Sequence, residues 1–254
     1  MLRKAIRNVV NKLGYDLVKP DERLVINGLP ADFDKEVVNT YNRVKPFTMT
    51  TPERISALCN AVNYLVKNKI EGDFVECGVW RGGSTMAAID TLIKAGDKNR
   101  EIYLYDTYEG MSEPTDHDKV FTGTGADVLM NTSDKNDATS VWCYSALEEV
   151  QKNVGTLNYP AKSVHFVKGK VEDTIPQTIP QKIALLRLDT DWYESTAHEL
   201  KYLFPLLVPG GVLIIDDYGH WEGARKAVDE YIENEKLPLL LNRIDYTGRI
   251  AIKY

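Results

Sequence analysis

The chain has 254 residues and a formal net charge of −6, from 31 basic and 37 acidic side chains. This balance provides no general attraction for a polyanion, so nucleic acid is not an expected partner. A hydrophobic share of 43% is typical of a globular protein that buries one sizeable core. No apolar run reaches the roughly 18 residues of a membrane span, and no signal-peptide pattern opens the sequence, so we expect a cytoplasmic protein.

The first residues predict a basic amphipathic helix over residues 2–13, because apolar residues recur at helical spacing and basic residues cover the other face. Two roles fit this helix. It is either an arm that packs on the domain or on a second subunit, or a peripheral contact with an anionic membrane surface. Residues 20–48 show no clean period and are expected to be a connecting segment. We assign residues 1–50 to an N-terminal helical extension and residues 51–254 to the main domain.

From residue 51 onward, strands alternate with helices. Thr51 and Pro52 have the cap and first-turn proline of a helix start. The apolar runs predict strands near 73–79, 101–107, 164–169, 183–189 and 210–216, with helices near 84–95, 145–154, 194–207 and 221–236. Apolar strands separated by helices predict a doubly wound α/β fold with a parallel sheet covered on both faces. Residues 238–244 and 248–254 predict a last pair of strands in a hairpin.

Residues 111–144 are rich in Gly, Asp, Thr and Ser. Loops of this length inside a compact domain are usually lids or disordered segments. We expect a lid over the strand ends.

A glycine-rich turn joins the first of these strands to its helix, from Gly78 to Ser84. Glycine lets the backbone approach a ligand closely, and the helix N-terminus offers free N–H groups. The turn is not a dinucleotide fingerprint, because Val79 and Trp80 follow Gly78 directly. It is not a phosphate-binding loop either, because Ser84 stands where that loop has lysine. The turn favours a nucleotide-like ligand, with an ordinary strand–helix connection as the alternative.

Two acidic residues near this turn narrow the choice of ligand. Glu76, at the end of the strand, suits a cationic group, and Asp106 ends the next strand, where such folds bind ribose hydroxyls. S-adenosylmethionine carries an ammonium, a sulfonium and a ribose. It is therefore the ligand that we expect.

Paired carboxylates end two further apolar runs: Asp189 and Asp191 end one, and Asp216 and Asp217 end the other. Parallel strands present their carboxyl ends at one edge of the sheet, so these side chains should meet. Clustered carboxylates raise each other's pKa or require a cation, and oxygen ligands favour Mg²⁺ over zinc. The alternative is structural, with Asp191 as a helix cap and Asp217 as the start of a turn.

A cation beside a sulfonium predicts methyl transfer to a hydroxyl group. Full proton transfer from an alcohol of pKa about 15.7 to an aspartate of pKa about 3.9 costs roughly 16 kcal/mol. A divalent ion lowers the pKa of the hydroxyl and makes a carboxylate a feasible acceptor. Asp191 lies two residues past Asp189, and therefore on the same face of an extended chain, so we expect it to be the base.

Four segments resemble the macrocin O-methyltransferase family, which belongs to the wider catechol O-methyltransferase-like group. They are residues 74–84, 105–111, 188–196 and 209–218. The resemblance covers about residues 45–254, and its Asp-x-Asp-x-Tyr-Glu-Ser-Thr element is specific. It implies a Rossmann-like seven-stranded methyltransferase fold with an antiparallel C-terminal hairpin, dependence on S-adenosylmethionine and Mg²⁺, and a sugar or phenolic hydroxyl of a natural product as acceptor.

The resemblance also implies roles by motif position. Asp189, Asp216 and Asp217 would hold the metal and Asp191 would be the base. The cofactor site would comprise Glu76, Gly78, Trp80 and Ser84 at the methionine end, Asp106 at the ribose, and Val171 and Glu172 at the adenine.

Three residues near the acidic motifs are candidates for the acceptor pocket: Trp192, Tyr218 and His220. Aromatic faces suit a sulfonium or a sugar ring, although Trp and Tyr also commonly complete a core.

The sequence thus predicts a Mg²⁺-dependent O-methyltransferase that acts on a small glycosyl acceptor, in a natural product or a surface glycan, and forms a homo-oligomer. Two alternatives remain open. One is a nucleotide-dependent sugar oxidoreductase or epimerase, and the other is a non-catalytic methyltransferase-like scaffold docked through its basic helix.

Overall fold

A computed structural model describes residues 10, 12, 25–26, 28–135, 137 and 140–254. The chain divides into two compact units, residues 1–38 and residues 39–254. In the first unit, β1 (Val25–Ile26) pairs antiparallel with β2 (Leu29–Pro30). The basic helix expected over residues 2–13 lies outside the described residues except at positions 10 and 12, so it stays a prediction.

Part of the expected connecting segment is helical. Helix α2 (Lys35–Val44) is followed by the 3-10 turn η1 (Lys45–Phe47). The Thr40 hydroxyl donates to Asp90 on helix α4 (Gly83–Lys94) at 2.7 Å, and Arg43 pairs with the same carboxylate. These contacts explain why the main unit begins before residue 51, where the sequence alone places the boundary.

The main unit contains a seven-stranded sheet with the order β5-β4-β3-β6-β7-β9-β8. Its strands are β3 (Asp73–Cys77), β4 (Ile102–Asp106), β5 (Val164–Lys168), β6 (Ile183–Leu188), β7 (Leu207–Ile215), β8 (Asn242–Arg243) and β9 (Arg249–Ile252). Strands β3 to β7 are parallel, whereas β9 runs antiparallel to both β7 and β8. The predicted doubly wound sheet with its antiparallel C-terminal hairpin is confirmed.

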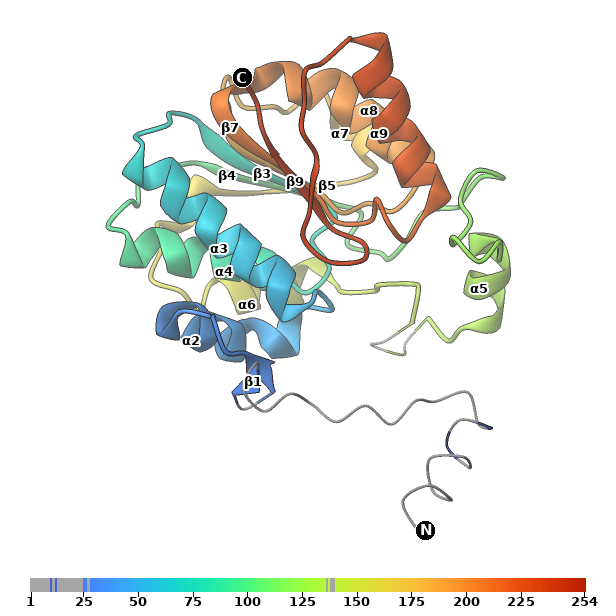
Figure 1. The fold of residues 1–254 in the computed structure, drawn as a ribbon, viewed down its shortest axis with the longest axis horizontal. Helices are drawn as coiled ribbons and strands as arrows, with labels where there is room; N and C mark the ends of the chain where they lie inside the picture. Colours follow the sequence, from blue (N-terminus) through green and yellow to red (C-terminus); the bar gives the residue numbers. More distant parts are fainter. Residues whose placement is uncertain (1–9, 11, 13–24, 27, 136, 138–139) are drawn as a thin grey trace. The chain divides into compact units, whose positions relative to one another are not determined.

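Helices cover both faces of this sheet (Figure 1). One face carries α3 (Pro52–Lys67), α4 (Gly83–Lys94) and α6 (Leu147–Val154), and the other carries α7 (Val171–Thr174), α8 (Tyr193–Leu203) and α9 (Glu222–Asn234). The 3-10 turns η2 (Ala161–Ser163) and η3 (Phe204–Leu206) precede β5 and β7. Helix α3 begins where the sequence predicts, because the Thr51 side chain accepts a hydrogen bond from the Arg54 N–H.

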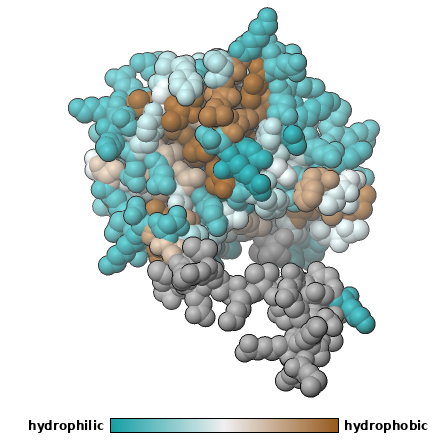
Figure 2. Space-filling view, viewed as in Figure 1, coloured by the Kyte–Doolittle hydropathy of each residue, from teal (hydrophilic) through white to brown (hydrophobic). Residues whose placement is uncertain are grey.

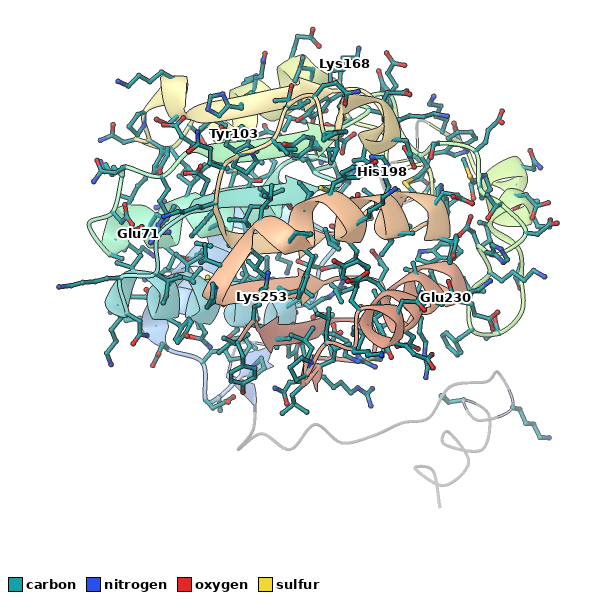
Figure 3. The ribbon with its side chains drawn as sticks, turned by 90° about the horizontal axis from the view of Figure 1, so that it is seen from above. Glu71, Tyr103, Lys168, His198, Glu230 and Lys253 are labelled. Carbon is teal, nitrogen blue, oxygen red and sulfur yellow. The ribbon has the colours of Figure 1, made fainter. Side chains whose placement is uncertain are left out.

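The common direction of the parallel strands places their carboxyl ends together. In Figure 3, Glu71, which precedes β3, lies at one end of the sheet, and Lys168, the last residue of β5, lies toward the other. Strand β6 is buried at every position, as expected for the centre of a covered sheet. Figure 2 shows apolar residues gathered over the segment that leads into β8 and over β9, where Leu240 and Ile252 are exposed.

The segment over residues 111–144 packs in part against the rest of the main unit, while Phe121 and Val128 are exposed. It contains α5 (Ala126–Thr132), whose Ala126 and Met130 are buried in a cluster with Trp192 and Trp221. Its Val120 also forms a bridge with Trp221. Some residues of this segment therefore form part of the wall of the site at the carboxyl ends of the strands, and movement as a lid stays a prediction.

Among the described residues, no helix combines the length and apolar character needed to cross a bilayer.

Candidate active site

A cavity of about 480 Å³ lies at the carboxyl ends of the strands, within the range of small-molecule sites. It brings together twelve of the residues singled out in the sequence: Glu76, Gly78, Trp80, Ser84, Asp106, Val171, Glu172, Asp189, Asp191, Asp216, Asp217 and His220. Trp192 and Tyr218 are not among the described residues that line it. The motifs around β3, β4, β6 and β7 therefore converge on one site.

Close contact between two strand ends requires the glycine at position 78. Gly78 has a φ of +80°, and a Cβ there would lie 1.9 Å from the carbonyl oxygen of Asp189, at the end of the neighbouring strand β6. The sequence interpretation explained this glycine by the approach of a ligand. The structure adds a packing reason, and this contact places the glycine turn against the residues that begin the acidic motif.

Asp106 holds this turn in place. Its carboxylate accepts hydrogen bonds from the backbone N–H groups of Val79 at 2.7 Å, Trp80 at 3.1 Å and Tyr108 at 2.7 Å. The bonds tie the end of β4 to the turn after β3. The buried indole Nε1 of Trp80 has no partner among the described residues, so it leaves a hydrogen-bond donor at the cavity for a ligand.

Arg187, which the sequence interpretation did not use, lies at the centre of the acidic residues. Its guanidinium contacts Glu76 Oε1 at 2.7 Å, Asp189 Oδ2 at 2.6 Å and Asp216 Oδ1 at 2.7 Å. Arg187 is 4% exposed, and it pairs in register with Glu76 on β3. The sequence does contain a signal for this role, because a single arginine inside a buried apolar strand requires carboxylate partners.

A second arginine, Arg54 on α3, approaches the same group from the other side. It pairs with Asp216, and its Nε lies 3.0 Å from Asp245 Oδ2. The Asp216 carboxylate thus lies between two guanidinium groups. Glu76 is also satisfied within the chain, since its second oxygen accepts a hydrogen bond from the Thr85 hydroxyl.

The remaining three acids form a compact group. Oxygen atoms of Asp189, Asp191 and Asp217 all lie within 4.8 Å of one another. Burial raises the pKa of Asp191 to about 7, and it raises the pKa values of Asp189 and Asp217 well above their ordinary range. Repulsion between neighbouring carboxylates adds to the rise. The buried Oδ2 of Asp217 has no hydrogen-bond partner among the described residues.

The cavity therefore has an excess of acid. Five carboxyl groups are clustered at one end of it, those of Glu76, Asp189, Asp191, Asp216 and Asp217. Glu76, Asp189 and Asp216 pair with Arg54 or Arg187, whereas Asp191 and Asp217 have no ion pair among the described residues. Carboxylate oxygens with a free acceptor atom fit a hard divalent cation such as Mg²⁺.

The raised pKa of Asp191 predicts a pH-dependent stability of the metal-free protein. Between the ordinary value of 3.8 and about 7, the folded chain binds a proton that the unfolded chain has lost. The free energy of unfolding should therefore fall as the pH rises through this window, by up to about 4 kcal/mol from this group. Urea denaturation with a chelator across the window checks this, and Asp191→Asn should flatten the slope. An equally steep slope in that variant would contradict the prediction.

Two expected pocket residues have structural positions instead. Trp192 is 2% exposed, packs edge-on against Trp221 with ring centroids 4.9 Å apart, and donates from Nε1 to the Ser112 carbonyl. The Tyr218 hydroxyl donates to Asp229 Oδ1 at 2.6 Å. Neither side chain is among the described residues that line the cavity, although Ser112 and Trp221, the partners of Trp192, do line it. This differs from the sequence prediction.

Asp118 from the 111–144 segment caps helix α8, the position that the structural alternative gave to Asp191. Its Oδ1 accepts from the Tyr193 N–H at 2.8 Å, and its Oδ2 accepts from the Thr115 N–H at 2.7 Å. Asp118 is 1% exposed. No feature of the sequence indicated this role, because the cap lies far from the helix along the chain.

Removing this cap should destabilise the protein. Asp118→Ala leaves the first N–H of α8 buried without its acceptor, so we expect a loss of about 1 to 2 kcal/mol in the free energy of unfolding. Denaturant titration measures it, with Asp116→Ala as a control because Asp116 is exposed. Equal stability of the two variants would contradict the capping role.

His220 lies at the cavity among aromatic side chains. Its Nδ1 is 3.3 Å from the Tyr246 hydroxyl, and its ring meets Trp221 and Phe121 edge-on. Burial and the charge of Arg54 lower the pKa of His220, so its ring is neutral near pH 7. A neutral imidazole offers both a donor and an acceptor for an acceptor hydroxyl.

Comparison with solved structures agrees with this geometry. The O-methyltransferase NovP superposes with a TM-score of 0.70 and 29% sequence identity, covering 82% of each chain. The fold and the site thus define an S-adenosylmethionine-dependent O-methyltransferase of the Rossmann-like class.

Sequence comparison identifies the family. The model of the macrocin-O-methyltransferase (TylF) family matches residues 11–252. A tetracenomycin-C rhamnosyl 4'-O-methyltransferase from Streptomyces olivaceus is 31% identical over 248 residues, covering 98% of this chain and 89% of that protein. Mycinamicin III 3''-O-methyltransferase from Micromonospora griseorubida is 31% identical over 201 residues, covering 79% of this chain and 76% of that protein. The chain belongs to the macrocin-O-methyltransferase family, as its sequence motifs suggest.

Proposed function

We propose that the protein transfers a methyl group from S-adenosylmethionine to a hydroxyl group of a sugar moiety, in a natural product or a surface glycan, and that it requires Mg²⁺. The observation that carries the metal requirement is the excess of acid in the cavity. A divalent ion would supply positive charge beside Asp191 and Asp217, the two carboxyl groups of the cluster that have no ion pair among the described residues. The rhamnosyl group named for one relative and the natural product named for the other support the substrate class.

Asp189, Asp216 and Asp217 are proposed to hold the ion. Each Asp216 oxygen keeps a further lone pair while it accepts from an arginine, so its pairing with Arg54 and Arg187 leaves it able to bind. The two arginines fix the orientation of this carboxylate in advance. When bound, the ion would lower the pKa of an acceptor hydroxyl near the cluster.

Asp191 is proposed to take the proton of the acceptor hydroxyl. Its pKa of about 7 lies near neutral pH, where a general base combines an unprotonated form with useful basicity. His220 and Tyr246 would bind the acceptor at the cavity. Their polar atoms and aromatic faces both suit a sugar ring.

The cofactor is proposed to extend along the glycine turn. Glu76, Gly78, Trp80 and Ser84 would line its methionine end, Asp106 would accept from the ribose, and Val171 and Glu172 would flank the adenine. The unpartnered Trp80 Nε1 and the held carboxylate of Asp106 supply polar contacts in this part of the cavity.

Methyl-transfer assays against a panel of glycosides, read by mass spectrometry, test the proposal. We expect a singly methylated product with Mg²⁺ present, loss of turnover with a chelator, and recovery when Mg²⁺ is restored. Turnover that survives the chelator would overturn the metal requirement. Membership of the macrocin-O-methyltransferase family leaves the oxidoreductase and scaffold alternatives without support.

The expected homo-oligomer and membrane contact stay predictions. Light scattering of the purified protein tests the first, and sedimentation with anionic vesicles tests the second, with deletion of residues 2–13 as the control for the basic helix.

A further inference from the structure

Asp191 lies at the centre of a strained three-residue turn. Its φ of +69° falls in the left-handed region that residues other than glycine rarely adopt. The Trp192 N–H donates to the Thr190 carbonyl at 2.8 Å, which closes a γ-turn around Asp191. A conformation of this kind persists only where the surrounding structure fixes both ends.

The far end of the turn is fixed by Trp192. Its indole is buried against Trp221, and its Nε1 donates to the Ser112 carbonyl at 3.0 Å. This anchoring determines where the chain leaves the turn and enters α8.

The near end of the turn is fixed by a hydrogen bond to helix α8. The Thr190 hydroxyl donates to Glu199 Oε1 at 2.9 Å. Glu199 is 0% exposed, and it is not among the described residues that line the cavity. The neighbouring Leu200 and Leu203 on the helix pack in the apolar core. Burial of a carboxyl group at this position costs free energy that an apolar side chain would not, so packing alone does not explain Glu199.

Glu199 differs from the carboxylates of the cavity. Its Oε1 accepts from Thr190, and its Oε2 has no hydrogen-bond partner among the described residues. Burial raises the pKa of Glu199 well above its ordinary value, which favours the neutral acid. In either form its Oε1 is an acceptor for the Thr190 hydroxyl.

We propose that Thr190 and Glu199 are positioning residues for Asp191, and that the hydrogen bond between them fixes the turn that presents the Asp191 carboxylate to the acceptor hydroxyl. The inference rests on the proposed role of Asp191 as the base. The buried carboxyl group of Glu199 on α8 would then serve to orient the side chain of Asp191.

Four variants test this inference in the full-length protein with Mg²⁺ and S-adenosylmethionine. Thr190→Val removes the donor and Glu199→Leu removes the acceptor, so each should lower kcat by roughly 10- to 100-fold through misplacement of Asp191. The KM values for both substrates and the Kd for S-adenosylhomocysteine should stay unchanged. Thr190→Ser and Glu199→Gln keep a donor and an acceptor, and they should recover kcat.

Three results would overturn the inference. They are wild-type kcat in Thr190→Val, a loss of cofactor affinity that matches the loss of kcat, and a loss in Glu199→Gln as large as in Glu199→Leu. If Glu199→Leu does not fold, the two Thr190 variants decide, because Thr190 is only partly buried. Wild-type turnover in Asp191→Asn would show that Asp191 is not the base and would contradict the proposed function itself. An inactive Asp191→Asn together with a fully active Thr190→Val would contradict only the positioning role of Thr190 and Glu199.

Discussion

Asp191→Asn is expected to lower kcat by about 10²- to 10⁴-fold, the usual contribution of a general base, while the protein still binds S-adenosylhomocysteine. The amide keeps the size of the side chain but takes up no proton. Asparagine also tolerates the left-handed backbone that position 191 requires, so the turn should survive the change. The result would isolate proton transfer from folding and from cofactor binding.

Single-turnover kinetics and calorimetric titration with S-adenosylhomocysteine measure the two effects separately. Asp116→Asn is the matched control, because it makes the same chemical change at an exposed position of the 111–144 segment. Wild-type turnover in Asp191→Asn would exclude this residue as the base. Loss of cofactor binding in the same variant would show that Asp191 shapes the cavity rather than the reaction.

Arg187→Met is expected to cost about 3 to 5 kcal/mol in the free energy of unfolding, the range for removing one partner of a buried ion pair. The change leaves the carboxylates of Glu76, Asp189 and Asp216 without the guanidinium that joins them. The free energy of unfolding of a domain is usually only about 5 to 15 kcal/mol, so this change would remove a large part of it. Denaturant titration measures it directly.

Arg100→Met is the matched control for this prediction. Arg100 is also buried, but it pairs with one carboxylate, that of Asp97, and otherwise donates to the carbonyl groups of Gly72 and Ile70, so its removal leaves fewer carboxylates unpaired than that of Arg187. Adding Glu76→Gln to Arg187→Met should recover part of the lost stability, because it removes one of the carboxylates that lost its guanidinium partner. The loss of stability should also become smaller as the pH falls, because the unpaired carboxylates then take up protons. Equal losses in the two arginine variants would contradict the central role of Arg187.

The sequence predicted those parts of the fold and the site that follow from local patterns. Apolar runs marked the parallel strands, and the Thr51 cap marked the start of α3, because burial and capping act over a few residues. The convergence of Glu76, Asp106 and the acidic motifs followed from the rule that parallel strands share a carboxyl edge.

Contacts between distant segments escaped prediction. The sequence interpretation required a cation between the acidic strands but did not identify Arg187, which supplies part of that charge from within β6. The aromatic residue Trp192 and the cap Asp118 depend on how residues 111–144 pack, and no local pattern encodes that packing. Helix α2 was missed although Val37, Val38, Tyr41 and Val44 have helical spacing, because it was read together with the irregular residues that precede it.

The cap on α8 has a consequence for protein engineering. Asp118 belongs to residues 111–144, several of which line the cavity, yet it supports the helix that begins directly after the Asp191 turn. A chimera that replaces residues 111–144 without a carboxylate at position 118 would therefore disturb this turn along with the cavity wall. Grafts that retain Asp118 and the Ser112 carbonyl contact would allow the cavity wall to be changed while the turn is kept.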